Sequence, residues 1–140
     1  DAAGAVIGIT SLRLGEAPHV DLAIPIELFL AGKDELVARG RVTSRAPRPW
    51  LGLYTAPDAR GVVVSGLSPL SPARAAGVRP GDVIVQVNGR QIASREDFYH
   101  TLWQGGLDQD VQVTVERLGG RHAITVRPVD RYRFYRAPDK

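Results

Sequence analysis

The sequence predicts a mainly β protein with two to three helices, an α+β fold in which two strands and a helix precede a small, partly open β-barrel. Short runs of β-branched residues recur between glycine and proline turn signals, and this pattern is typical of short strands. Only a few segments show the helical spacing of apolar residues. Residues 43–49 (TSRAPRP) show neither pattern, so we expect a linker between two units there.

The composition is that of a globular chain large enough to bury a core. Of the 140 residues, 44% are hydrophobic and 24% are charged, as in ordinary folded domains. The formal net charge of +3 comes mainly from scattered arginines, which argues against a nucleic-acid or membrane partner. No apolar run reaches membrane-spanning length. Cysteine is absent and the three histidines, His19 among them, lack ligand spacing, so we expect no metal and no cofactor.

The first 42 residues predict two strands and a helix. Residues 5–10 and 20–24 are β-branched runs, which we expect to pair across a polar loop. From Ile26 the apolar residues recur at helical spacing. We expect this helix to end at Gly40, and Gly32 lowers its helix propensity in the interior.

Residues 50–130 predict short strands and two helices. A short helix is expected between an N-cap at Ser71 and a stop at Gly77, and a longer one from Ser94 to about Gln104. The expected strands cover residues 51–55, 62–64, 83–87, 111–115 and 123–126.

The segment from Arg48 to Leu53 (RPWLGL) holds the first candidate site. Gly52 lacks a Cβ, so another backbone can approach it closely. If the N–H groups of Leu51, Gly52 and Leu53 converge, they form a nest suited to a carboxylate. The alternative is an ordinary strand start with a glycine kink, and these six residues alone favour that alternative.

Four motifs in order give residues 50–127 a family resemblance. They are WLGL at 50–53, SPARAAG at 71–77, RPGDVI at 79–84 and VNG at 87–89. In this order they resemble a PDZ domain of the type found in bacterial HtrA (DegP-like) serine proteases. Residues 4–9 (GAVIGI) and 22–25 (LAIP) are similar to strands near the end of that family's trypsin-like domain.

The resemblance implies a domain division and a parent protein. It implies a C-terminal remnant of the protease domain at 1–42, a linker at 43–49, a PDZ-like partly open barrel at 50–130 and a basic, aromatic tail at 131–140. The family's catalytic loop would end just before Asp1, and no G-x-S-x-G motif occurs in the chain. We therefore expect no catalytic residue in this chain, although the parent would be a serine endopeptidase.

The resemblance also implies a peptide-binding site. The N–H groups of Leu51, Gly52 and Leu53 would hold the C-terminal carboxylate of a substrate protein with an apolar last residue. The peptide would lie along the strand at Tyr54, against a helix stripe at i, i+4 and i+7; the groove residues are thus Tyr54, Arg95, Tyr99 and Leu102. A β-branched residue at position 52 would abolish this binding in a domain that remains folded.

Two of these residues have an alternative interpretation, and a third has a consequence for peptide selectivity. Leu102 at helical spacing is also what a plain core leucine would show. Arg48 would add a positive field near the carboxylate, against the alternative of a solvated linker arginine. Arg95 stands where PDZ domains that select Ser or Thr use histidine, so we expect no strong Ser or Thr preference and some tolerance of an acidic residue.

Two other function classes compete with the peptide-binding module of a protease. One is an adaptor whose protease domain is degenerate, so that binding is the whole function. The other is a nucleic-acid-binding barrel, suggested by the interleaved basic and aromatic residues 131–136 (RYRFYR); a short terminal segment ordinarily packs back on its domain. By resemblance we expect a periplasmic or cell-envelope protein that contacts its own protease domain and oligomerises through it.

Overall fold

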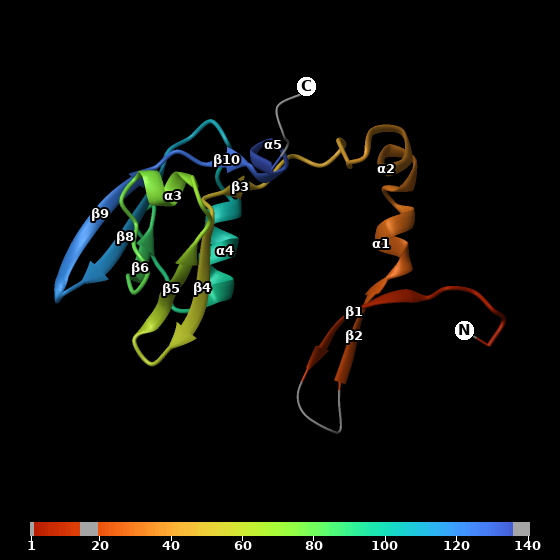
Figure 1. The fold of residues 1–140 in the computed structure, drawn as a ribbon, viewed down its shortest axis with the longest axis horizontal. Coiled ribbons are helices and arrows are strands. Elements are labelled where there is room, and N and C mark those ends of the chain that lie inside the picture. Colours follow the sequence, from red (N-terminus) through yellow and green to blue (C-terminus); the bar gives the residue numbers. More distant parts are fainter. Residues whose placement is uncertain (1, 15–19, 136–140) are drawn as a thin grey trace. The chain divides into compact units, whose positions relative to one another are not determined.

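The computed structural model describes residues 2–14 and 20–135 and divides into two compact units, Asp1–Ala46 and Pro47–Lys140 (Figure 1). The predicted fold class is confirmed, because strands predominate and helices are short. The described residues hold five helices where the sequence predicts two to three. The main sheet stays open and does not close into a barrel.

Unit 1 is a two-stranded hairpin followed by two helices. Strands β1 (Gly8–Leu14) and β2 (Val20–Pro25) pair antiparallel. The single helix expected from Ile26 is divided into α1 (Ile26–Leu30) and α2 (Lys33–Arg39). The break falls at Gly32, where a Cβ would lie 2.6 Å from Val42 Cγ2. Helix α2 ends at Gly40, whose φ of +69° is the left-handed conformation that glycine tolerates.

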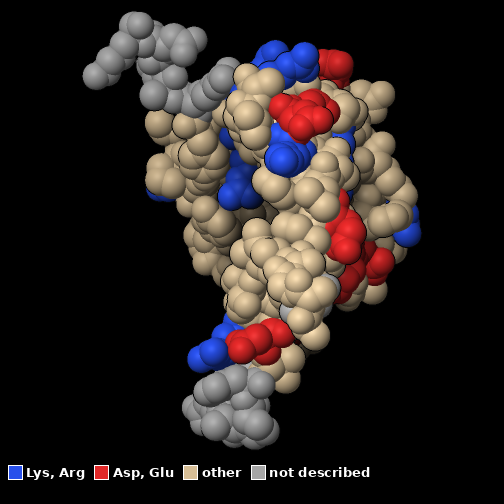
Figure 2. Space-filling view, turned by 90° about the vertical axis from the view of Figure 1, so that its right-hand side faces the viewer, with Lys and Arg blue, Asp and Glu red and all other residues tan. Residues whose placement is uncertain are grey.

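The described residues of unit 1 bury no large apolar side chain. The exposed ones come from both strands and both helices and include Ile9, Leu22, Ile24, Leu28, Phe29 and Val37. Figure 2 shows one face of the molecule, where small groups of acidic and basic side chains lie among uncharged ones. Polar contacts join helix α2 to the segment that follows it. Glu35 accepts hydrogen bonds from Ser44 and Thr43, and these bonds lower the pKa of Glu35 to about 2.

Unit 2 is built on an antiparallel sheet of order β4-β5-β6-β8-β9, to which β7 adds beside β6. Strands β3 and β10 pair separately. Helix α4 lies beside β4 at one side of this sheet (Figure 1). The elements in order are β3 (Pro49–Trp50), β4 (Leu53–Asp58), β5 (Gly61–Leu67), α3 (Pro72–Ala75), β6 (Val83–Val87), β7 (Arg90–Gln91), α4 (Arg95–Trp103), β8 (Val111–Arg117), β9 (Gly120–Val126), β10 (Val129–Asp130) and α5 (Arg131–Tyr135).

The two helices predicted in unit 2 form, but they are capped differently. The Ser94 hydroxyl accepts a hydrogen bond of 3.1 Å from the Asp97 N–H, as expected of an N-cap. Ser71 stands at the N-cap position of α3, yet its side chain makes no capping bond. The Leu51 carbonyl instead accepts from the Ala73 N–H at 2.9 Å. A chain segment distant in sequence therefore satisfies this helix end.

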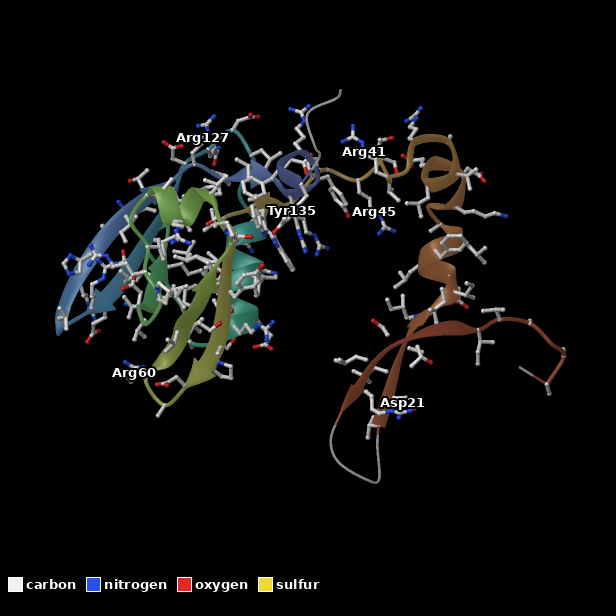
Figure 3. The ribbon with its side chains drawn as sticks, viewed as in Figure 1. Asp21, Arg41, Arg45, Arg60, Arg127 and Tyr135 are labelled. Atoms are coloured by element: carbon white, nitrogen blue, oxygen red, sulfur yellow. The ribbon has the colours of Figure 1, made fainter. Side chains whose placement is uncertain are left out.

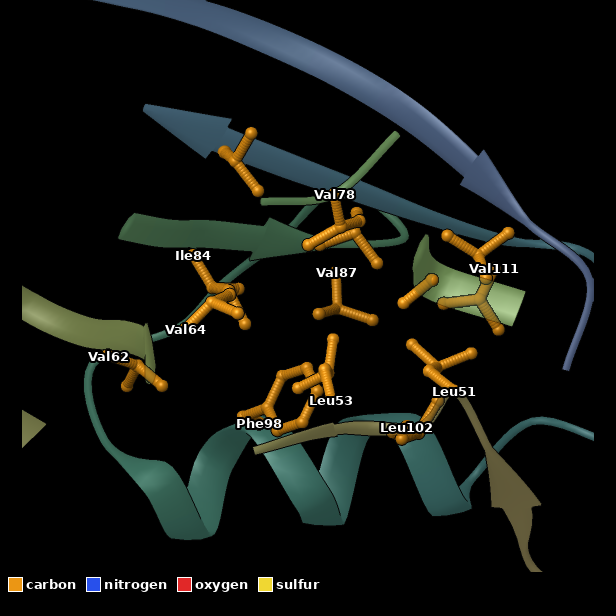
Figure 4. Packing of buried hydrophobic residues seen from close by; sticks show 14 of the residues in the cluster. Leu51, Leu53, Val62, Val64, Val78, Ile84, Val87, Phe98, Leu102 and Val111 are labelled. Carbon is orange, nitrogen blue, oxygen red and sulfur yellow. The ribbon is translucent and has the colours of Figure 1, made fainter. Parts of the chain in front are cut away.

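The core of unit 2 lies between α4 and the sheet (Figure 4). Phe98 and Leu102 project from α4 into one cluster with Leu51 and Leu53. Strand β8 contributes the alternate residues Val111, Val113 and Val115, all buried, as the period of a half-buried strand requires. Burial of this cluster is the main stabilisation of the unit.

An ion pair between a buried carboxylate and a partly exposed guanidinium joins the turn before β6 to the end of β8. Asp82 is 1% exposed, and its two carboxylate oxygens accept from the Arg117 guanidinium at 2.7 Å each. The Arg79 N–H donates to the same carboxylate at 2.8 Å. Burial alone would raise the pKa of Asp82, but the Arg117 guanidinium and the Arg79 N–H hold that pKa below its ordinary value.

We expect Asp82→Asn to lower the free energy of unfolding of unit 2 by about 2 kcal/mol, because charged hydrogen bonds are lost in a buried place. The folded-state pKa of Asp82 is depressed, so its stabilisation is present above the unfolded pKa of about 3.9 and is lost as the pH falls through the folded value. Urea unfolding followed by tryptophan fluorescence measures this, since both tryptophans, Trp50 and Trp103, lie in unit 2.

The matched control is Asp110→Asn, which breaks the exposed pair between Asp110 and Arg127. Exposed pairs contribute little, so this variant should unfold like the wild type. A wild-type advantage over Asp82→Asn that persists unchanged at pH 3 would contradict the assignment.

Candidate functional site

The backbone at Gly52 packs against two side chains at a distance that excludes any other residue. Its φ is +74°, and an added Cβ would lie 2.3 Å from Ser71 Cβ and 2.9 Å from Trp50 Cη2. A β-branched residue here would therefore disturb the fold. The expectation of a folded β-branched variant at this position is not supported by the geometry.

Two carbonyls fasten the loop that contains Gly52. The Leu51 carbonyl accepts from Ala73 N–H at 2.9 Å, and the Gly52 carbonyl accepts from Ser68 N–H at 2.8 Å. In a trans peptide the carbonyl and the next N–H point in opposite directions. The N–H groups of Gly52 and Leu53 therefore point away from the β5–α3 segment, on the side where strand β4 has no neighbour.

Strand β4 is one edge of the main sheet and pairs only with β5 among the described residues. The Ser68-to-Gly52 bond flanks the pair Leu53–Leu67, so this pair is of the non-hydrogen-bonded type. The backbone groups of Leu53 consequently face the open edge. Such an edge accepts an added strand, and α4 stands beside it.

The predicted groove residues divide into buried and exposed groups. Leu51, Leu53 and Leu102 belong to the core cluster, so the alternative considered for Leu102 describes its packing. Tyr54 is 55% exposed and Tyr99 is half-buried against the core. Only the exposed or half-buried groups can change their contacts without disturbing the core.

A row of stacked side chains, exposed at Arg95 and Trp103 and half-buried at Tyr99, runs along α4. The Arg95 guanidinium carbon lies 5.9 Å from the Tyr99 ring centre, and the Tyr99 and Trp103 ring centres are 5.4 Å apart. Arg48 lies 4.2 Å over the Trp103 ring, a cation–π distance. Arg48 is thus held against α4. Trp103 is not among the site residues predicted from the sequence, although a position four residues after Tyr99 lies on the same side of a helix.

Helix α5 covers Trp50, the residue two positions before Gly52. The Trp50 ring centre lies 4.7 Å from that of Phe134 and 5.5 Å from that of Tyr135. The hydroxyls of Tyr135 and Ser68 share a hydrogen bond of 2.9 Å. Residues 131–135 of the expected tail are therefore packed on unit 2, and residues 136–140 lie outside the described residues.

The other candidate chemistries find little support in the described residues. They contain no group of three or more His, Asp or Glu side chains that could hold a metal ion, and His19 is outside them. Within the same residues no helix is long and apolar enough to cross a membrane. An open hollow of about 320 Å³ is lined by Leu67, Arg74, Gly77, Val78, Arg79 and Pro80, and none of these residues belongs to β4 or α4.

Charge is dispersed over unit 2. Arg60 lies at the turn between β4 and β5, whereas Arg127 lies at the opposite end of the unit (Figure 3). Arg60 and Arg127 are also paired with Asp58 and Asp110. These two arginines therefore do not belong to one basic patch.

The edge strand, the glycine loop and the flanking helix correspond to a known domain. The family model described as PDZ domain matches residues 49–127. The chain belongs to the PDZ domain family. The motifs that predict this resemblance, from WLGL at 50–53 to VNG at 87–89, all lie inside the matched PDZ range.

Curated relatives of this PDZ chain are HtrA- and DegP-type proteases, which confirms the second part of the resemblance. The putative serine protease HhoA of Synechocystis sp. is 29% identical over 91% of the chain and 36% of the relative. Protease Do-like 1, chloroplastic, of Arabidopsis thaliana is 32% identical over 91% of the chain and 34% of the relative. The chain thus spans about a third of the length of these two relatives.

Solved structures of HtrA-type proteases have a fold similar to that of this chain. The structure described as HtrA-type protease AlgW with decapeptide has a TM-score of 0.59 at 24% identity, covering 91% of this chain and 43% of that one. The serine endoprotease from Yersinia pestis has a TM-score of 0.55 at 25% identity, covering 91% and 44%. These likenesses support the fold of the chain.

We expect Gly52→Ala to destabilise unit 2 by more than about 2 kcal/mol, because the new Cβ meets Ser71 in addition to a strained φ. Gly119→Ala is the matched control, since Gly119 has a φ of +76° but nothing within 4 Å of an added Cβ. That variant should cost only about 1 kcal/mol, the penalty of the left-handed backbone. Equal urea midpoints for the two variants would show that close packing at Gly52 is unimportant.

Proposed function

We propose that the PDZ domain of this chain binds the C-terminal ends of other proteins. The observation that carries the proposal is the orientation of the Gly52 and Leu53 N–H groups, which point away from their own domain at the open edge of β4. A C-terminal peptide can meet both features at once. Its carboxylate accepts from the loop, and its main chain pairs with the edge.

The bound peptide would lie between β4 and α4. Its main chain would extend the sheet beside Leu53–Thr55, and the carboxylate would accept from the Gly52 and Leu53 N–H groups, with Leu51 N–H as the proposed third donor. The surroundings of the last side chain would be Leu51, Leu53 and Leu102. Because this surrounding is aliphatic, an apolar C-terminal residue is favoured.

Selectivity upstream of the last residue would come from the exposed groups on the two walls. Arg95 begins α4 and its guanidinium lies near the Tyr99 ring. A cation there favours an acidic peptide side chain and provides no histidine-like acceptor for Ser or Thr. Tyr54 lies on the opposite wall and would contact the peptide side chains that point across β4.

The role in the parent protein is inferred from the relatives. They carry names such as probable periplasmic serine endoprotease DegP-like, so we propose that residues 1–42 end a protease domain and that the PDZ domain tethers or regulates its substrates. Unit 1 supports this, because its exposed apolar side chains need a partner surface. We propose a periplasmic or envelope location from the word periplasmic in these names, whereas another relative is described as chloroplastic. An adaptor role would follow if the parent lacks a Ser-His-Asp set.

A peptide with a free C-terminal carboxylate and an apolar last residue should bind at least about tenfold more tightly than the same peptide amidated at its C-terminus. The amide removes the charge that the two N–H groups attract, and charged hydrogen bonds contribute on the order of 1.5–3 kcal/mol. Fluorescence anisotropy with a labelled decapeptide measures both dissociation constants. Equal values would refute carboxylate recognition.

Arg95→Glu should reverse the charge preference two positions before the peptide C-terminus, from Asp or Glu to Lys or Arg. The physical reason is the exchange of a cation for an anion at the start of α4. Arg121→Glu is the matched control, because Arg121 is exposed on β9, the strand at the far edge of the sheet. Titrations with peptides that differ only at this position give the ratio, and a ratio that moves equally in both variants would contradict the role of Arg95.

A further inference from the structure

Helix α5 is attached to the strand that leads into the carboxylate loop. Strand β10 pairs with β3 through Val129–Trp50 and Asp130–Pro49. The buried Asp130 carboxylate accepts from the Tyr132 N–H at 2.9 Å, which caps the first turn of α5. The chain that follows β10 is thereby directed back over Trp50.

The Trp50 ring is packed between α5 and Gly52. On one side it meets the rings of Phe134 and Tyr135. On the other, its Cη2 lies 2.9 Å from the place of a Gly52 Cβ. Displacement of the Trp50 ring would therefore release the backbone at Gly52, whose N–H we assign to the peptide carboxylate.

A second contact reaches the same peptide group from the other side. Ser68 is buried, and its N–H donates to the Gly52 carbonyl. The carbonyl of Gly52 and the N–H of Leu53 belong to one peptide plane. The Ser68 hydroxyl is bonded to the Tyr135 hydroxyl, so α5 also fixes the residue that orients the Leu53 N–H.

We propose that α5 is a positioning element for carboxylate recognition, acting through Trp50 and through the Tyr135–Ser68 hydrogen bond. This inference rests on the proposed function and identifies the element that orients the N–H groups of the site. The last helix sets how well the two loop N–H groups are aimed, and thus how strongly a free C-terminus is distinguished from an internal or blocked one. Phe134, Tyr135 and Ser68 are positioning residues and do not themselves touch the peptide.

The test compares Tyr135→Phe, Ser68→Ala and the double variant with the wild-type chain. For each, anisotropy gives dissociation constants for the decapeptide with a free carboxylate and for its amidated form. We expect each single variant to reduce the ratio of the two constants by about threefold, the effect of one hydrogen bond. The double variant should reduce it no further, because both changes remove the same bond.

Tyr132→Phe is the matched control. It removes a hydroxyl from the same helix, from a side chain that is 68% exposed, and should leave the ratio unchanged. Urea unfolding of every variant accompanies the titrations, because a purely structural role would change stability or weaken both peptides equally without changing the ratio.

The outcomes separate the two proposals. A wild-type ratio near one overturns the proposed function and this inference with it. A high wild-type ratio that all variants retain overturns only the positioning role of α5. Tighter binding in Tyr135→Phe would show that α5 obstructs the loop, and equal loss for both peptides would show general support; either result also overturns the inference.

Discussion

The close approach of the chain at Gly52 is the constraint on which the arrangement of unit 2 depends. It requires a glycine with positive φ, a small neighbour at Ser71 and a fixed ring at Trp50. The approach is stabilised by the hydrogen bond from Ala73 N–H to the Leu51 carbonyl. This bond replaces the side-chain cap that Ser71 does not supply, so the start of α3 and the candidate site share one interaction.

The bonds that hold the loop also orient the N–H groups that we propose bind a carboxylate. Each carbonyl that turns inward toward α3 or Ser68 sends the next N–H outward, because the peptide unit is planar and trans. The edge position of β4 leaves space for a ligand chain on that side. The proposed carboxylate site therefore needs no dedicated side chain, because the loop backbone supplies the N–H groups.

The sequence predicts most of the fold because local signals and tertiary contacts agree in unit 2. Gly52, the N-cap Ser94 and the alternation of residues 111–115 are local signals. The loop, the helix α4 and the strand β8 that they predict all form. What it misses depends on distant contacts. The helix break at Gly32 follows from packing on Val42, and α5 follows from stacking on Trp50. Spacing along α4 predicts that Leu102 continues the row of Arg95 and Tyr99. In the structure Leu102 is buried in the core and Trp103 continues the row, because packing against the sheet decides which side of a helix stays accessible.

The overlap of core and candidate site limits where specificity can reside. Leu51, Leu53 and Leu102 are core residues, so a substitution that reshapes the proposed surroundings of the last peptide residue also changes the packing of Phe98. Substitution of Tyr54 or Arg95 does not change the core packing, since both side chains are exposed. Variation in ligand preference at constant stability should therefore arise at these exposed positions. The proposed preference for an apolar last peptide residue depends on the same buried leucines that keep the domain folded.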